Sequence, residues 1–220
     1  MDPREDEKRA AAQAAALLVE EGMRLGLGSG TTVAHFLPAL ARRKLDVLCV
    51  ATSVSTEEAA RSLGLSVQPF DVMDRLDLAV DGADQVAPDL WVVKGGGGAH
   101  TREKVAAAAA DRFVIIVSSD KLVDALGPPI PLEVLRFGLP ATMRQLSSLG
   151  EITQREAELT PEGNVLVDYL GPVEDPRSMS EDLRAIPGVV AHGLFEPALV
   201  SEVLVGKPDG TVDRLSPQRT

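Results

Sequence analysis

The sequence predicts an α/β protein built around a mostly parallel β-sheet, with a second, smaller α/β domain. Up to Lys121, short apolar stretches typical of buried strands alternate with helical patterns, as in βαβ units. A proline-rich segment then begins, and new elements follow in the order βαββαβ. Because open parallel sheets bind ligands at the carboxyl ends of their strands, we expect the functional residues there.

The larger domain is expected to contain five buried strands with helices between them. The strands are the apolar stretches Met23–Gly28, Leu45–Ala51, Leu76–Val80, Leu90–Val93 and Phe113–Val117. The helices are an alanine-rich one from Asp2 to about Glu21, then Thr32–Lys44, Thr56–Leu63 and Thr101–Asp111. Pro38 lies inside the second helix, which we expect to continue through it with a kink.

The smaller domain is predicted to follow the stiff segment 127–131. Its elements are the strand Glu133–Phe137, the helix Ala141–Leu149, the strands Glu151–Ala157 and Val165–Leu170, the helix Met179–Ala185, and one or two strands within Val189–Val205. This order predicts a ferredoxin-like sandwich with its helices on one face. We assign residues 1–127 and 206–220 to the larger, catalytic domain, and residues 128–205 to the smaller one, as an oligomerisation and lid domain.

Composition is that of an ordinary globular protein. The 220 residues are 45% hydrophobic and 25% charged, which allows a sizeable core. The net charge of −11 argues against non-specific nucleic-acid binding, which needs clustered cations. No stretch reaches the ~20 apolar residues of a membrane span, no apolar signal segment follows the acidic N-terminus, and Cys49 is the single cysteine. We expect a cytoplasmic protein without a nucleic-acid or membrane partner.

The first candidate motif is GLGSGTT, residues 26–32, between a predicted strand and a predicted helix. Glycines allow a tight turn, and the start of the helix presents N–H groups to an anion such as a phosphate. Two alternatives stay open. The loop half matches a dinucleotide fingerprint that lacks its third glycine, and it is also compatible with a plain strand-to-helix turn.

The second motif is DGAD, residues 81–84, directly after the strand ending at Val80. Two carboxylates at the end of a strand can accept hydrogen bonds from substrate hydroxyls, and one of them can transfer a proton. An Asx turn with solvated carboxylates is an equal alternative. Metal ligation is disfavoured because His35, His100 and His192 are scattered and Cys49 is alone.

The third motif is KGGGGAHTREK, residues 94–104, again between a strand and a helix. Four glycines in a row cost conformational entropy, but their N–H groups can approach a ligand closely and face a developing oxyanion. Lys94 adds a cation, and Glu103 lies in the first helical turn as a candidate base. A flexible glycine linker is the alternative interpretation.

Together these motifs resemble the ribose-5-phosphate isomerase family, type A. The resemblance also includes Ser119-Asp120-Lys121 and GVVAHGLF, residues 188–195, and extends in order from about Lys8 to about Gly210. It implies a Rossmann-like larger domain completed by the C-terminal tail and a smaller α/β domain. It also implies interconversion of D-ribose 5-phosphate and D-ribulose 5-phosphate in the pentose phosphate pathway, without metal or other cofactor.

The resemblance also implies roles for the matching residues. Glu103 would move the proton between C2 and C1 through a cis-enediolate. Lys94 and the amides of the glycine run would stabilise the enediolate charge, Asp81 would move protons among the sugar oxygens, and Asp84 would orient hydroxyls. The substrate-binding set would be Ser29, Gly30, Thr31 and Thr32 around the phosphate, with Lys121 and Lys8, and Gly82, Ala83, Gly95, Gly96 and Gly97 elsewhere on the sugar phosphate.

Two other function classes and one assembly hypothesis remain. A sugar-phosphate sensor could have kept the phosphate loop without the chemistry, and a nicotinamide-dependent oxidoreductase could use the first glycine loop. His100 stands where the family pattern has an apolar residue, and we expect it to be a neighbour of the site. A homodimer or homotetramer is implied by the resemblance, and the stretches 198–200 and 203–205 could pair across its two-fold axis.

Overall fold

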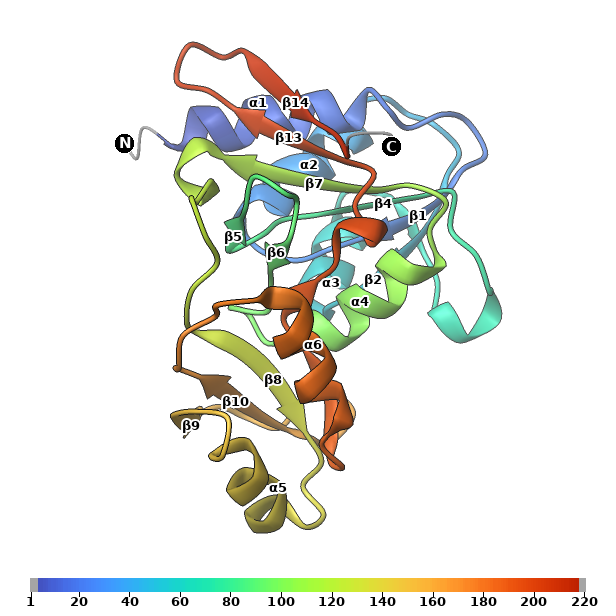
Figure 1. The fold of residues 1–220 in the computed structure, drawn as a ribbon. Coiled ribbons are helices and arrows are strands. Elements are labelled where there is room, and N and C mark those ends of the chain that lie inside the picture. The colour runs from blue at the N-terminus through green and yellow to red at the C-terminus, as the bar shows by residue number, and fades with distance from the viewer. Residues whose placement is uncertain (1–3, 218–220) are drawn as a thin grey trace. The chain divides into compact units, whose positions relative to one another are not determined.

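The computed structural model describes residues 4–217, which form two compact units (Figure 1). The first runs up to Ala83 and includes Arg102–Leu122 and the chain from Pro197 onward, whereas the second comprises Asp84–Thr101 and Val123–Glu196. Compared with the predicted division, residues 84–101 and 123–127 therefore pack with the second unit and residues 197–205 with the first. The predicted helix start at Asp2 and Pro3 lies outside the described residues.

The first unit contains a seven-stranded sheet in the order β14-β13-β7-β4-β1-β2-β3. The strands are β1 (Arg24–Leu27), β2 (Leu48–Ala51), β3 (Ser66–Val67), β4 (Leu78–Asp81), β7 (Phe113–Ser118), β13 (Glu202–Gly206) and β14 (Val212–Leu215). All neighbours are parallel except β13 and β14. The chain progresses from β1 to β3 towards one edge and from β4 to β7 towards the other, so the order reverses between β1 and β4, where such sheets bind ligands.

Helices cover both faces of this sheet, which explains why the residues inside its central strands β1, β4 and β7 are mostly apolar on both faces. They are α1 (Arg4–Ala16), α2 (Thr31–Ala41), α3 (Val54–Ser62) and α4 (His100–Ala109), with short 3-10 turns η1 (Phe70–Val72), η2 (Ser119–Lys121) and η3 (Pro197–Leu199). Phe36 and Leu40 of α2 belong to the main core cluster, and Ala106 of α4 packs with Val50 and Leu76. As expected, α2 continues through Pro38.

Two predictions for this unit were wrong. The first helix ends at Ala16 rather than near Glu21, and the Arg43 guanidinium binds the carbonyl groups of Ala16 and Val19 where it ends. Neither stretch expected to pair across a dimer axis is an exposed strand of the smaller domain. The stretch 198–200 overlaps the 3-10 turn η3 of the first unit, and the stretch 203–205 lies in β13, which pairs with β7 on one side and β14 on the other. These residues therefore cannot pair across a dimer axis.

The second unit contains the predicted βαββαβ order. The strands β8 (Ile130–Val134), β9 (Ile152–Gln154), β10 (Val165–Tyr169) and β11 (Val189–His192) form an antiparallel sheet in the order β11-β8-β10-β9, with helices α5 (Leu139–Leu146) and α6 (Pro176–Ala185). This strand order is that of a ferredoxin-like fold. The two-domain α/β fold class predicted from the sequence is confirmed.

The sequence misplaced one strand of this unit and missed a small sheet. Strand β8 begins at Ile130 and contains Pro131, so the last two residues of the proline-rich segment 127–131 belong to the sheet, while Phe137 lies outside it. A three-stranded antiparallel sheet, in the order β12-β6-β5, forms from β5 (Gln85–Val86), β6 (Val92–Val93) and β12 (Leu194–Phe195). The stretch Leu90–Val93, predicted as a strand of the larger domain, contains β6 and so belongs to the second unit. Strand β5 has two residues, which give too short a pattern to predict a strand from sequence.

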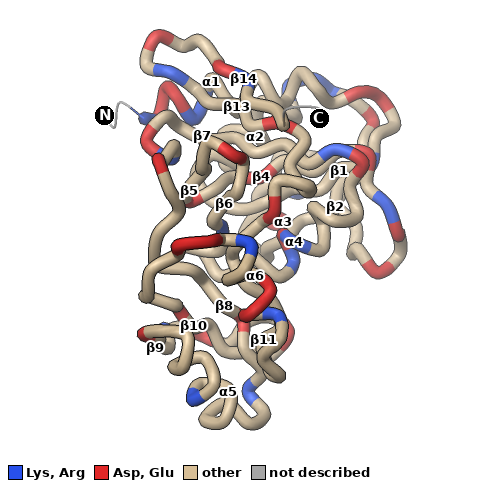
Figure 2. The backbone as a smooth tube through the Cα atoms, in the orientation of Figure 1, with Lys and Arg blue, Asp and Glu red and all other residues tan. Residues whose placement is uncertain are grey.

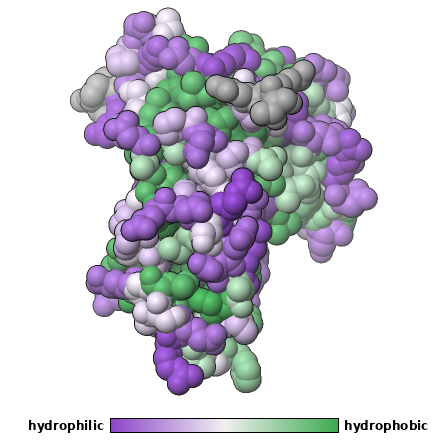
Figure 3. Space-filling model, in the orientation of Figure 1, coloured by the Kyte–Doolittle hydropathy of each residue, from purple (hydrophilic) through white to green (hydrophobic). Residues whose placement is uncertain are grey.

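The surface is chemically mixed. Lys and Arg positions are interspersed with Asp and Glu positions along the described chain (Figure 2), and apolar patches show between polar ones on the face drawn in Figure 3. Within residues 4–217, no helix has the length and apolar character needed to cross a bilayer.

The position of β13 can be tested by truncating its core. Leu204 is fully buried in the core of the first unit, so Leu204→Ala should lower the free energy of unfolding by about 2–5 kcal/mol. Leu17, which is 72% exposed, gives the control Leu17→Ala, expected to change it by less than about 0.5 kcal/mol. Urea unfolding measures both, and equal stabilities for the two variants would contradict the placement of β13.

Candidate active site

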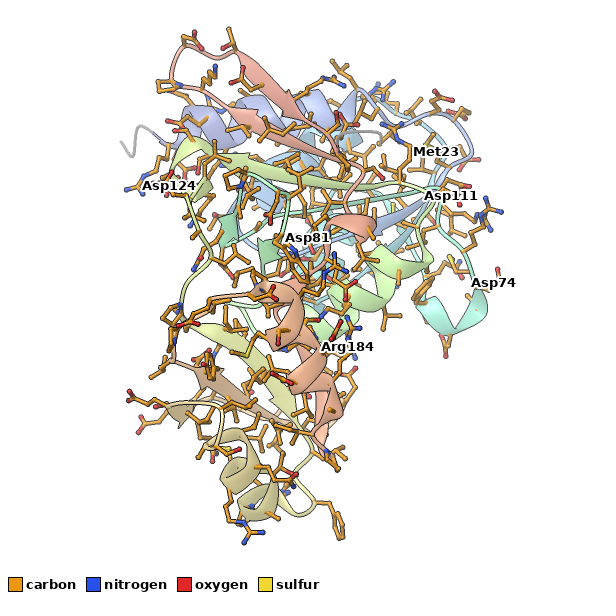
Figure 4. All side chains as sticks on the ribbon, in the orientation of Figure 1. Met23, Asp74, Asp81, Asp111, Asp124 and Arg184 are labelled. Carbon is orange, nitrogen blue, oxygen red and sulfur yellow. The ribbon has the colours of Figure 1, made fainter. Side chains whose placement is uncertain are left out.

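Asp81, labelled in Figure 4, ends β4 at the switch point and is 2% exposed. Its Oδ1 accepts hydrogen bonds from the N–H groups of Ser29 at 3.0 Å and Gly82 at 2.7 Å. The carboxylate lies directly against Gly28, where an added Cβ would be 2.0 Å from Asp81 Cγ. A glycine is required at position 28 because any side chain would displace this carboxylate.

Glu103 lies in the first turn of α4 and is also buried, with 4% exposed. Its Oε1 accepts a hydrogen bond from Ser29 Oγ at 2.6 Å. Ser29 therefore binds both carboxylates, donating its backbone N–H to Asp81 and its hydroxyl to Glu103. The loop after β1 thus connects the two acidic candidates of the first unit, a contact that the sequence did not predict.

The same loop leads into the N-terminus of α2. Gly30 is the N-cap, with a φ of 94°, and no side chain caps the helix. Thr31 is exposed and Thr32 is buried in the first turn. A helix start without a side-chain cap leaves N–H groups that can donate hydrogen bonds to an anion, as the sequence predicts for residues 29–32.

The two predicted cationic anchors of the first unit have acidic neighbours. Lys8 Nζ lies 2.9 Å from Glu5 Oε1, and His35 Nε2 lies 2.8 Å from the other oxygen of Glu5. Hydrogen bonds from Lys8 and then His35 keep the pKa of Glu5 below its usual value. Lys121 Nζ lies 4.0 Å from Asp120 in η2. Both lysines thus have a carboxylate beside them in this structure.

The η2 turn that carries Lys121 is fixed by a buried acid of α1. Glu7, 4% exposed, accepts hydrogen bonds from the N–H and the hydroxyl of Ser119, each at 2.7 Å. Burial raises the pKa of Asp120, but hydrogen bonds from Ser118 and Arg4 outweigh it and leave that pKa below its usual value.

Lys94 follows β6 in the second unit and is 3% exposed. Its ammonium lies 5.7 Å from the centre of the Phe195 ring, a cation–π contact. Its backbone N–H donates to Gly193 O at 2.8 Å, and a Cβ on Gly193 would be 2.2 Å from Lys94 O. The motif at 188–195 therefore supports Lys94, which explains why a glycine lies between His192 and Leu194.

The glycine run after Lys94 is held by side chains of the same unit. Gly96 N–H donates to Asp84 Oδ2 at 2.8 Å, and the Arg155 guanidinium donates to the carbonyl oxygens of Gly95 and Gly96 at 3.0 and 3.1 Å. Gly95 is buried, whereas Gly96 and Gly97 are exposed. The run is thus an ordered loop, and Asp84 Oδ2 accepts a hydrogen bond from its Gly96 N–H.

A buried acid fixes the start of α4. Glu133, 1% exposed, accepts hydrogen bonds from Thr160 Oγ1 at 2.9 Å and Asn164 Nδ2 at 2.7 Å, and also from the Thr101 hydroxyl. His100, fully buried, packs against Gly95, where a Cβ would be 2.7 Å from its Nδ1. His100 is thus a neighbour of the glycine loop, as expected.

The structure brings the predicted residues together in two sets, one in each unit. The first unit contains Ser29, Gly30, Thr31, Thr32, Asp81, Gly82, Ala83, Glu103, Lys8 and Lys121, and the second contains Asp84, Lys94, Gly95, Gly96 and Gly97. Within residues 4–217 no three His, Cys, Asp or Glu side chains form a group that could hold a metal ion. Cys49 is buried, which raises its pKa to about 12 and makes it an unreactive thiol.

Sequence reasoning missed Arg155 and Asp168. The guanidinium of Arg155, which directly follows β9, donates to both oxygens of Asp168 in β10, at 2.8 and 2.7 Å. Because the strands Glu151–Ala157 and Val165–Leu170 were predicted, opposite charges on these two strands were the available signal. The contacts of Arg155 with Gly95 and Gly96 had no such signal, since they join residues 59 and 60 positions apart.

Comparison with known proteins gives a consistent result. The model of the family "Ribose 5-phosphate isomerase A (phosphoriboisomerase A)" matches residues 48–210. Ribose-5-phosphate isomerase A of Rhodopseudomonas palustris (strain HaA2) is 43% identical, over 96% of this chain and 99% of that protein. The crystal structure of ribose 5 phosphate isomerase A from Neisseria gonorrhoeae is 31% identical, covers 96% of both chains and has a TM-score of 0.91. A D-ribose-5-phosphate isomerase in complex with phospho-erythronic acid is 33% identical, with a TM-score of 0.90 over 97% of this chain and 99% of that one.

The fold and the buried acids at the carboxyl edge of the larger sheet define a two-unit α/β enzyme. The extent of the similarity then fixes the group: the chain belongs to the ribose-5-phosphate isomerase A family. Membership of this isomerase family replaces the oxidoreductase alternative considered for the first glycine loop.

The contact between Gly28 and Asp81 gives a test of the site geometry. Gly28→Ala should lower the free energy of unfolding by about 1–3 kcal/mol, because the added methyl group must displace the buried Asp81 carboxylate. Gly127→Ala is the matched control, since nothing lies within 4 Å of a Cβ at that position. Urea titration of both variants measures the difference, and a Gly28→Ala protein as stable as its control would contradict this packing.

Proposed function

We propose that this protein interconverts D-ribose 5-phosphate and D-ribulose 5-phosphate, as the name of its family indicates. The observation that carries the proposal is the hydrogen bond between Ser29 and Glu103. It joins a buried carboxylate to the loop that opens α2, so that a candidate base and a candidate phosphate site lie in one unit. An aldose phosphate needs both at once, an anchor for its phosphate and a base near its carbonyl end.

Phosphate binding is assigned to the start of α2. Ser29, Gly30, Thr31 and Thr32 offer backbone N–H groups and hydroxyls, and the positive end of the helix dipole favours an anion there. Lys121 and Lys8 supply positive charge to the same ligand. The Ser29 hydroxyl also donates a hydrogen bond to Glu103, so Ser29 connects the proposed phosphate site with the proposed base.

Proton transfer is assigned to Glu103. Its carboxylate removes the proton from C2 of the open-chain aldose, the electrons of that C–H bond form the C1=C2 double bond, and the carbonyl oxygen becomes negatively charged. Glu103 then returns the proton to C1, which leaves the carbonyl at C2. Asp81 moves the remaining proton between the two oxygens, including during ring opening, and the N–H groups of Ser29 and Gly82 keep its carboxylate in one orientation.

Stabilisation of the enediolate is assigned to the second unit. Lys94 provides a cation, and the glycine run provides N–H groups that approach a ligand without side chains in the way. Asp84 orients substrate hydroxyls, and Gly82, Ala83 and Gly95–Gly97 line the sugar phosphate. We also infer a cytoplasmic enzyme that needs no metal ion.

Replacing the base should abolish turnover and leave the fold intact. Glu103→Gln should lower kcat by at least about a hundredfold, because an amide cannot accept the C2 proton. Its oxygen can still accept the hydrogen bond of Ser29, so thermal stability should stay close to that of the parent. Conversion of D-ribose 5-phosphate to ketose, measured in the presence of a chelator, reports the effect.

The control is Glu58→Gln, the same change at an exposed position of α3, which should turn over like the parent. High activity in Glu103→Gln would refute the role of Glu103. Binding of ribose 5-phosphate without turnover by the parent itself would contradict the isomerase and is what a sensor predicts.

We further propose that the enzyme is a homodimer or homotetramer. Leu135, Phe137 and Val190 of the second unit are 43, 92 and 42% exposed, and β11, which carries Val190, is an edge strand. Exposed apolar side chains at a sheet edge favour self-association. Light scattering should give the mass of two or four chains, and a single-chain mass at working concentration would contradict the proposal.

A further inference from the structure

We propose that Arg155, oriented by Asp168, is a positioning residue that sets the direction of the backbone N–H groups in the glycine loop. The inference rests on the proposed function, in which this loop stabilises the enediolate. It assigns to the β9–β10 strand pair a part in the reaction, in addition to the expected role of this domain in oligomerisation.

The guanidinium uses each of its three nitrogens. Its Nε and Nη2 donate to the two oxygens of Asp168 at 2.8 and 2.7 Å, which is the bidentate geometry that orients an arginine most strictly. Its Nη1 donates to Gly95 O and Gly96 O at 3.0 and 3.1 Å. The side chains of Arg155 and Asp168 are only 17 and 18% exposed, so solvent competes weakly with these contacts.

These contacts fix the directions of two peptide groups. In a trans peptide the C=O and the following N–H point in opposite directions. Holding Gly96 O towards Arg155 therefore directs the N–H of Gly97 away from Arg155. Holding Gly95 O does the same for the N–H of Gly96, and that N–H indeed donates to Asp84 at 2.8 Å. Arg155 and Asp84 thus hold opposite sides of one peptide group, which leaves the Gly97 N–H as the amide assigned to substrate.

The loop depends on such contacts because it has no side chains of its own. Gly95 and Gly98 have φ angles of +102° and +80°, which other residues rarely adopt, and a Cβ on Gly98 would be 2.5 Å from Leu166 of β10. Glycine-rich backbone has many alternative conformations in solution. Hydrogen bonds from a fixed guanidinium select one of them before substrate arrives, which is how preorganised donors lower the barrier.

The effect of Arg155 is one of orientation rather than of charge. Its positive charge is balanced by Asp168 at hydrogen-bond distance, so the pair as a whole adds little net potential to the loop. Loss of Arg155 should therefore weaken stabilisation of the enediolate and leave phosphate binding, which is assigned to the first unit, unaltered.

The test replaces Arg155 and compares kcat with KM. Arg155→Met keeps an unbranched side chain and removes all three donors, and it should lower kcat by about 10- to 100-fold while KM changes less than about threefold. Affinity for phospho-erythronic acid, whose carboxylate carries a negative charge like that of the enediolate, should fall with kcat. Affinity for inorganic phosphate should stay unchanged. Arg155→Lys should recover only part of the loss, because a lysine lacks the planar fork.

The chain offers a matched control in Arg75, which binds both oxygens of Asp111, labelled in Figure 4, at 2.8 and 2.7 Å. Arg75→Met breaks an equivalent bidentate pair without touching the glycine loop, and should leave kcat and inhibitor affinity at parental values. A role of Arg155 in stability alone predicts a lower melting temperature with normal kcat in the folded enzyme, and that result would overturn the inference.

Two further comparisons remove ambiguity. Should Arg155→Met fail to fold, Asp168→Asn takes its place, since it retains the guanidinium and weakens only its orientation. It should lower kcat by a smaller factor than the loss of Arg155, and an unchanged kcat would overturn the inference. The parent is assayed alongside. A parent that does not isomerise ribose 5-phosphate refutes the proposed function, whereas an active parent with a fully active Arg155→Met refutes only the role of Arg155.

Discussion

The arrangement of the first set of functional residues depends on the parallel pairing of β1 with β4. Leu27 lies opposite Val80 in this pair, so the chain leaves the two strands at the same edge, with Gly28 next to Asp81. The absent side chain of Gly28 lets the carboxylate of Asp81 occupy the space in which a Cβ would be 2.0 Å from its carbon. Ser29 can then donate to Asp81 and Glu103 at once, and α2 begins two residues further on, at Thr31. A change in the β1–β4 register would separate all of these groups.

The candidate residues of the second unit depend on a different kind of interaction. Polar side chains form hydrogen bonds to the backbone of the glycine loop, which has no side chains of its own to fix its conformation. Asp84 and Arg155 bind the two sides of the glycine loop, and Glu133 binds the hydroxyl of Thr101 where α4 begins. Glu133 is a carboxylate with 1% exposure, and such a group is tolerated in a protein interior only with several hydrogen bonds, here from Thr160, Asn164 and Thr101. The small domain therefore keeps polar residues inside where a domain built only for packing would have apolar ones.

The sequence predicted those elements whose residue pattern is complete within a short stretch of chain, and it failed where strand pairing between distant segments decides. Strands such as β7, buried along their whole length, and helices with a strong apolar stripe are visible in a short window, and so are loops that follow them. The sheet to which β13 belongs cannot be predicted from a short window of sequence. An apolar run at 203–205 is compatible with either sheet, and only its pairing with β7 assigns it to the first unit. The start of β8 was predicted wrongly for a related reason, because the strand contains Pro131. A proline usually interrupts a strand because it has no N–H to donate. Here Pro131 O accepts from Gly193 N–H, and Gly193 O accepts from Lys94 N–H, so the missing N–H leaves the Gly193 carbonyl paired.

At the proposed phosphate site, residue types alone overestimate how much the lysine side chains contribute to anion binding. The net charge of −11 is unfavourable for a sugar phosphate at long range, so attraction must come from groups close to it. Lys8 was assigned to this task, but its ammonium lies 2.9 Å from Glu5, whose lowered pKa keeps it ionised beside both Lys8 and His35. A lysine paired with a carboxylate attracts an anionic ligand less strongly than an unpaired one does. The N–H groups at the start of α2 have no side-chain cap to compensate them, and their positions are fixed by the helix itself. In the proposed phosphate site, the backbone is therefore expected to contribute more to anion binding than the lysines do. The loop that contacts Asp81 and Glu103 is also the one proposed to position the substrate.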